Sequence, residues 1–150
     1  LTTRKYKEWT TVVDGLRDSV VQEVSPRYNL IQIGESDNIK YENYGVNVDY
    51  LEKTNVNQLA YLIKHSSLHL GYDSLPVHLA SHFGIKIVGL WSRWSSHSYP
   101  YFSSPKDYII LEPDYDDIGI KPAFGDNDPY DLINTLCPER IIKSVKKILN

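Results

Sequence analysis

The fold of this chain is decided by the stretch from Leu68 to Ala80, which reads Leu-His-Leu-Gly-Tyr-Asp-Ser-Leu-Pro-Val-His-Leu-Ala. Its first five residues predict a short buried strand, Asp73 and Ser74 a sharp turn, and Pro76 the opening of a helix. The N–H groups in the first turn of a helix have no partner within the helix, and the helix dipole favours negative charge beside them. A strand, a polar turn and a helix start in this order therefore predict an anion site.

Predicted strands and helices alternate along the rest of the chain. Short apolar runs mark the strands, while apolar residues at helical spacing, with capping residues, proline and glycine, mark the helices. We expect strands at residues 28–34, 46–51, 68–72, 86–91 and 108–111, and helices at 5–21, 56–66, 76–83 and from 138 onward. The strand at 86–91 is almost continuously apolar, so we expect it to be buried on both faces. The alternation predicts an α/β fold with a parallel sheet that helices cover on both faces.

The turns after the strands are the first candidates for a binding site, because ligands of such sheets bind outside the carboxyl ends of the strands. These turns are Gly34-Glu35-Ser36, Asp73-Ser74-Leu75 and Ser92-Arg93-Trp94. Thr2-Thr3-Arg4 joins them if a strand precedes the first residue.

The composition limits the class of protein. With 150 residues, 41% of them hydrophobic, the chain can build one compact domain with a core. The net charge of -3 gives no basic excess for nucleic acid. The single cysteine, Cys137, excludes an internal disulfide and a Cys-rich metal site, which favours a reducing, cytoplasmic setting. No apolar run approaches the roughly 18 to 20 residues of a membrane span.

Two features suggest that the chain is a piece of a longer protein. It contains no methionine, and it opens abruptly on Leu1-Thr2-Thr3-Arg4, polar residues of the kind that follow a strand. Trimming of a short tag or leader would give the same appearance.

The run Asp73-Ser74-Leu75-Pro76-Val77-His78-Leu79-Ala80 resembles the Asp-(Thr/Ser)-Gly-Xaa-Xaa-His-Leu-Ala signature of family 9 glycosyltransferases, the ADP-heptose:lipopolysaccharide heptosyltransferases and their relatives. Further resemblances follow in the family's order: Thr2-Thr3-Arg4 with Lys7 and Trp9, the strand at 30–34, the helix at 57–63, the strand at 86–91, and Pro138-Glu139. The likeness covers most of the chain and weakens between Ser92 and Asn134. The chain departs from the pattern at Leu75 and Ser92, where the family has glycine.

The resemblance implies a GT-B glycosyltransferase, which is built from two Rossmann-like halves. Residues 1–150 would form its C-terminal half, a single domain that binds the nucleotide-sugar donor, and a missing N-terminal domain would bind the acceptor and carry the catalytic base. The implied reaction transfers a sugar, with heptose a candidate, from a nucleoside diphosphate to a glycan or lipid-linked, lipopolysaccharide-type acceptor. It would proceed with inversion and without metal or cofactor. The implied location is cytoplasmic, peripheral to the inner face of the membrane.

A leaving nucleoside diphosphate gathers negative charge in the transition state, and a helix start, hydroxyl groups and a lysine would stabilise it. At the helix start, Ser74 offers a hydroxyl and an N–H, and Leu75 and Val77 offer N–H groups, whereas Pro76 has none. The full set of expected donor-binding residues is Thr2, Thr3, Lys7, Glu35, Asp73, Ser74, Leu75 and His78.

The remaining members of this set have separate expected roles. Lys7 supplies a point charge to the phosphates, with Thr2 and Thr3 as hydroxyl donors. Glu35 would meet the ribose or the base, and His78 would support the turn. Lys7 and Glu35 have a plainer explanation as solvated surface charges.

Other readings apply to the turn. Asp73 and Ser74 would serve equally well as a turn and a helix cap. Leu75 in place of glycine would restrict the approach of a phosphate, and a positive φ there would be costly. His78 and His82 stand four residues apart and could share a metal, but no convergent cysteine or carboxylate lies nearby in the sequence, so we expect no metal site.

An aromatic, partly basic segment follows the strand at 86–91. It could stack a sugar or a base, contact the missing half, or serve as plain domain-packing surface. Its members are Trp91, Arg93, Trp94, His97, Tyr99, Tyr101 and Phe102.

Two alternatives to a glycosyltransferase stay open. One is another GT-B enzyme, such as a nucleotide-sugar epimerase. The other is a non-catalytic domain that keeps the fold as a binding or assembly module.

Overall fold

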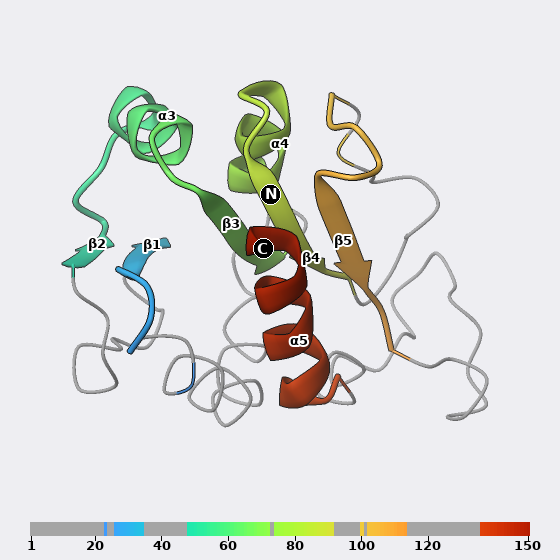
Figure 1. Cartoon of the computed structure of the whole chain (residues 1–150). Helices are drawn as coiled ribbons and strands as arrows, with labels where there is room; N and C mark the ends of the chain where they lie inside the picture. Colours follow the sequence, from blue (N-terminus) through green and yellow to red (C-terminus); the bar gives the residue numbers. More distant parts are fainter. Residues whose placement is uncertain are drawn as a thin grey trace, which may run out of the picture.

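The computed structural model describes Glu23 and residues 26–34, 48–72, 74–91, 100, 102–113 and 136–150. Figure 1 labels the strands and helices found in these residues. They are β1 (Ile31–Gly34), β2 (Val48–Leu51), α3 (Val56–Lys64), β3 (Leu68–Tyr72), α4 (Leu75–His82), β4 (Lys86–Leu90), β5 (Tyr108–Leu111) and α5 (Pro138–Leu149). The helix expected at 5–21 lies outside the described residues.

All strand pairs in the described residues are parallel, as expected. β3, β4 and β5 form one sheet in that order, with Leu68 beside Lys86 and Ile87 beside Tyr108. β1 and β2 form a second parallel pair. β1 lies close to the three-stranded sheet. Leu30, just before β1, packs against one hydrophobic core cluster, and Ile33 of β1 packs against the other.

Helices cover the three-stranded sheet on both faces, which confirms the predicted α/β architecture. On one face Val88, Leu90 and Leu111 meet the buried residues of α5, and Figure 1 shows α5 lying in front of the sheet. On the other face Ile87 and Trp91 meet the buried residues of α3 and α4. As expected, β4 is buried on both faces, since Ile87 and Val88 are fully inaccessible. This strand is the centre of the fold.

Local chemistry sets the ends of the helices. Asn55 caps α3 in a capping box, in which its side chain accepts from the Gln58 N–H and the Gln58 side chain accepts from the Asn55 N–H. Gly84 follows α4 with φ 69°, a left-handed conformation that costs glycine little and ends the helix. Cys137 precedes α5, with Pro138 in the first turn as predicted.

Three expectations need correction. β1 begins at Ile31 rather than at residue 28, and α4 begins at Leu75 rather than at Pro76. β3 is only partly buried, and Leu70 is 37% exposed. The reason is that β4 is the only strand hydrogen-bonded to β3 within the described residues, so β3 lies at a sheet edge.

Two glycines make room for rings above the sheet. The Trp91 ring lies over Gly89, where an added Cβ would be 1.8 Å from a ring carbon. On the neighbouring strand the His69 ring lies over Gly71, where a Cβ would be 2.8 Å from Nε2. Gly71 and Gly89 are partners in the β3–β4 register. This part of the sheet therefore needs glycine for packing rather than for backbone freedom.

No helix in the described part of the chain is both long enough and apolar enough to cross a membrane.

Candidate functional site: the start of α4

The carboxyl ends of β3, β4 and β5 meet at one edge of the sheet, because the three strands are parallel. Ser74 follows β3 at this edge, Trp91 follows β4 and Glu112 follows β5. α4 begins here directly after Ser74. The predicted anion site thus lies where ligands of such sheets bind.

Ser74 precedes α4 without capping it. Its backbone is extended, with φ -159° and ψ 174°, as in many N-cap residues, but its side chain makes no capping bond. Instead, the Ser74 Oγ donates to the Tyr72 carbonyl at 3.2 Å. The hydroxyl is exposed at the edge of the sheet, so the explanation of Ser74 as a plain helix cap is wrong for its side chain.

The N–H groups in the first turn of α4 differ in whether the described residues offer them an acceptor. The Val77 N–H donates to the Ser74 carbonyl at 3.1 Å, and Pro76 has no N–H. The Leu75 N–H has no acceptor among the described residues. One backbone donor at the positive end of the helix dipole therefore remains open to a ligand.

Leu75 is not strained in this position. It is the first residue of α4, and Glu52 is the one non-glycine residue with a positive φ in the described part of the chain. The expected cost of a positive φ at Leu75 is therefore absent. Its side chain is 50% exposed, beside this N–H group.

The two histidines of α4 do different things. His78 is exposed one turn after Ser74, on the helix that starts the site. His82 is exposed at the far end of α4, where its ring packs edge-on against Phe83 and Phe102 at 5.3 Å and 5.6 Å between centroids. Among the described residues, no group of three or more His, Cys, Asp or Glu side chains could hold a metal ion.

The structure places only part of the expected site. Ser74, Leu75 and His78 share the start of α4. The other expected residues lie outside the described residues and stay predictions, namely Thr2, Thr3, Lys7, Glu35 and Asp73.

The aromatic segment after β4 needs a correction at its first residue. Trp91 is 1% exposed and belongs to the core beneath α3 and α4, so its ring cannot stack a ligand. Phe102 is 73% exposed, and its backbone N–H donates to the buried Oγ of Ser81 at 3.0 Å. Residues 92–99 and Tyr101 lie outside the described residues.

Glu112 is a polar residue at this edge that the sequence reasoning missed. Its Oε1 is buried without a hydrogen-bond partner among the described residues, and burial raises the pKa of the carboxyl group. A glutamate directly after a predicted strand was the available signal.

His69 was missed as well. Its Nε2 is buried without a hydrogen-bond partner in the described part of the chain, and burial lowers the pKa of the imidazole to about 4. His69 is therefore neutral near pH 7, and it belongs to β3, the strand that leads to Ser74.

Two solved structures resemble this chain in fold. The glycosyl transferase family 9 structure from Veillonella parvula DSM 2008 matches with a TM-score of 0.71 at 17% sequence identity, over 90% of this chain and 40% of that chain. E. coli ADP-heptose LPS heptosyltransferase II matches with a TM-score of 0.65 at 15% identity, over 89% of this chain and 40% of that chain. No protein-family model and no curated protein matches the sequence.

At these identities the likeness shows the fold. It confirms the predicted Rossmann-like α/β architecture, and it confirms the resemblance to family 9 glycosyltransferases at the level of structure. The chain spans 40% of the length of each of these structures.

Proposed function

We propose that this chain is the C-terminal, donor-binding half of a GT-B glycosyltransferase of the family 9 type. The observation that carries the proposal is the open start of α4, where the Leu75 N–H has no acceptor in the described residues and the exposed Ser74 hydroxyl stands beside it. The fold shared with two such glycosyltransferases supports it.

The start of α4 fits the leaving group of such a reaction. When a nucleotide sugar reacts, the bond to the sugar breaks and negative charge grows on the released diphosphate. The Leu75 N–H and the α4 dipole would stabilise that charge, and the Ser74 Oγ could turn from the Tyr72 carbonyl to donate to a phosphate oxygen. Lys7, Thr2 and Thr3 complete the proposed phosphate site, and Glu35, Asp73 and His78 the rest of the donor site.

The complete enzyme would need a second domain. In the proposal that domain lies N-terminal to this one, binds a glycan or lipid-linked acceptor and supplies the catalytic base. The donor is a nucleoside diphosphate sugar, with heptose a candidate sugar, and the reaction needs neither metal nor cofactor. The enzyme would work in the cytoplasm at the inner face of the membrane.

Calorimetry with ADP, UDP, GDP and the corresponding nucleotide sugars tests the donor site. We expect one nucleoside diphosphate to bind, and Leu75→Pro to weaken it about tenfold, because the substitution removes one N–H that bonds a charged group. Proline is tolerated at the first position of a helix, and Ser74 already has the extended backbone that proline requires of its neighbour.

Leu75→Ala is the matched control, because it removes the same side chain and keeps the N–H. It should bind the nucleotide at least as well as the unmodified chain. Equal weakening by both substitutions would contradict a contact through the N–H. Failure of every nucleotide to bind the folded chain, also when joined to its N-terminal domain, would reject the donor site and favour a non-catalytic assembly module. Sugar isomerisation without an acceptor would instead indicate an epimerase.

A further inference from the structure

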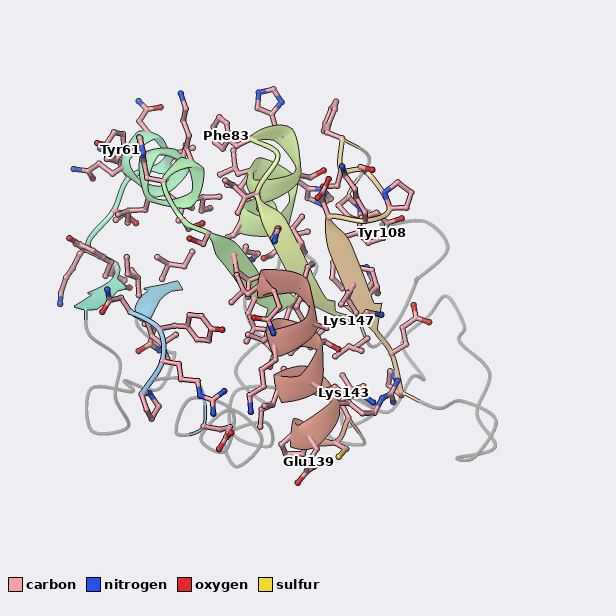
Figure 2. The ribbon with its side chains drawn as sticks, in the orientation of Figure 1. Tyr61, Phe83, Tyr108, Glu139, Lys143 and Lys147 are labelled. Atoms are coloured by element: carbon pink, nitrogen blue, oxygen red, sulfur yellow. The ribbon has the colours of Figure 1, made fainter. Side chains whose placement is uncertain are left out.

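The outer side of α5 is far more basic than the chain as a whole. The helix carries four basic residues and one acidic residue, whereas the whole chain has 16 Lys and Arg against 19 Asp and Glu. Arg140, Lys143 and Lys147 are exposed and follow the spacing of one helix face, and we call them the basic stripe. Figure 2 shows Lys143 and Lys147 along the outside of α5.

Interactions among the described residues do not account for the basic stripe. Lys146, next to it, pairs with Glu23 at 2.8 Å, and Arg140 reaches the Glu112 carbonyl with one nitrogen at 3.4 Å. Lys143 and Lys147 have no hydrogen bond or ion pair with any described residue. Like charges four residues apart weaken a helix slightly. The helix dipole favours Lys147 in the last turn but opposes Arg140 in the first.

The basic stripe runs along the side of the molecule, beginning at the candidate site's edge of the sheet. Arg140 contacts the residue that follows β5, which places the start of α5 at the carboxyl edge. The Lys86 Nζ donates to the Ile148 carbonyl at 2.6 Å, which places the end of α5 beside the start of β4. The stripe therefore begins at the same edge of the sheet as Ser74, on the face opposite α4.

We propose that the basic stripe attaches the protein to a membrane surface rich in anionic lipid headgroups. The apolar side of α5 is occupied by the sheet, so this attachment is electrostatic and inserts nothing into the bilayer. The role of this attachment rests on the proposed function, because a lipid-linked acceptor would lie in the same membrane surface. α4 lies on the opposite face of the sheet from α5, but both helices begin at the carboxyl edge, so attachment through α5 leaves that edge open to the acceptor.

Cosedimentation of the full chain with vesicles at low ionic strength, without nucleotide, tests the attachment. We expect binding to phosphatidylcholine vesicles that contain phosphatidylglycerol and none to phosphatidylcholine alone. The binding should vanish at about 1 M salt, where the screening length falls to about 3 Å. Lys143→Ala combined with Lys147→Ala should weaken it about thirtyfold, which corresponds to about 1 kcal/mol for each lysine near an anionic surface.

Lys64→Ala combined with Lys106→Ala is the control, because it removes the same charge from exposed positions on other elements and should leave vesicle binding unchanged. Equal weakening by the control would overturn the proposal, since net charge alone would then explain the binding. Absence of binding to the anionic vesicles would overturn it too. So would binding of duplex DNA through the same two lysines at equal strength, which would indicate a general polyanion surface. Calorimetry with nucleotides on the same samples tests the proposed function separately.

Discussion

Two neighbouring helices, α3 and α4, begin in opposite ways. At α3, the Asn55 and Gln58 side chains form a closed pair that satisfies two backbone N–H groups. At α4, the Ser74 side chain bonds back to the Tyr72 carbonyl, and the Leu75 N–H is left without an acceptor among the described residues. The start of α3 is complete as a structural element, whereas the start of α4 leaves a donor for something outside the chain.

The comparison teaches that residue type alone does not separate a cap from a site. Asparagine and serine are both strong N-cap residues, and both stand before a helix at the end of a polar turn. The capping box of α3 has a sequence signal, because Gln58 follows Asn55 at the right spacing. After Ser74 the corresponding position is Val77, which has no side-chain acceptor.

The largest effect is expected where the support of α4 is broken. Gly89→Ala places a Cβ against the Trp91 ring, so the ring must leave the cluster that it shares with Val77 and Ala80 of α4. We expect a loss of about 3 kcal/mol of unfolding free energy, measured by urea denaturation. Gly84→Ala is the control, because its Cβ meets no atom within 4 Å and its cost of about 1 kcal/mol is backbone strain alone. Equal costs would show that the Trp91 packing is unimportant.

A second effect comes from His69 in β3, whose ring nitrogen Nε2 is buried. Its pKa in the folded chain is about 4, against about 6.5 in an unfolded chain, so the unfolded state binds the extra proton first as the pH falls. The stability that this residue contributes is complete above pH 6.5 and is lost between pH 6.5 and about 4. The loss amounts to at most about 3 kcal/mol.

Carboxyl groups titrate in the same pH range. The contribution of His69 is therefore measured as the difference in unfolding free energy between the original chain and a variant without the histidine. We expect His69→Leu to flatten the pH dependence of the unfolding free energy between pH 6.5 and 4. Two parallel curves for the variant and the original chain would contradict a neutral, buried His69.

The smallest effect tests the two helix starts directly. Asn55→Ala should cost about 1 kcal/mol of unfolding free energy, because it opens the capping box of α3. Ser74→Ala should change the unfolding free energy by less than about 0.5 kcal/mol, since its hydroxyl makes no cap and is exposed. Thermal denaturation of both variants measures the contrast. A larger loss for Ser74→Ala than for Asn55→Ala would reverse it.

The sequence predicted most helix and strand positions well, because these depend on the pattern of apolar residues and on the capping and glycine residues at the ends. β3 and β5 have the predicted bounds, and Asn55 and Gly84 stand where their chemistry required. The long apolar run of β4 correctly predicted that this strand is buried on both faces.

The positions and contacts of individual side chains were harder to predict. Nothing in the pattern says that the Trp91 ring folds over Gly89 into the core, or that the Ser74 hydroxyl bonds backward. The concern about a positive φ at Leu75 came from the glycine that the family has at this position. Because α4 begins one residue earlier than expected, Leu75 is part of the helix and has ordinary helical geometry. These outcomes depend on rotamers and on single-residue shifts of helix ends.

The order of elements in the three-stranded sheet has a consequence for how the chain folds. β3, α4, β4 and β5 are consecutive, and each strand pairs with the next one in the sequence. The contacts of this segment therefore close shorter loops than its packing against α5, which arrives from residues 136–150, and short loops close at a lower entropic cost. We expect amide protons of β3 and β4 to be protected from solvent exchange early in refolding, before those of α5.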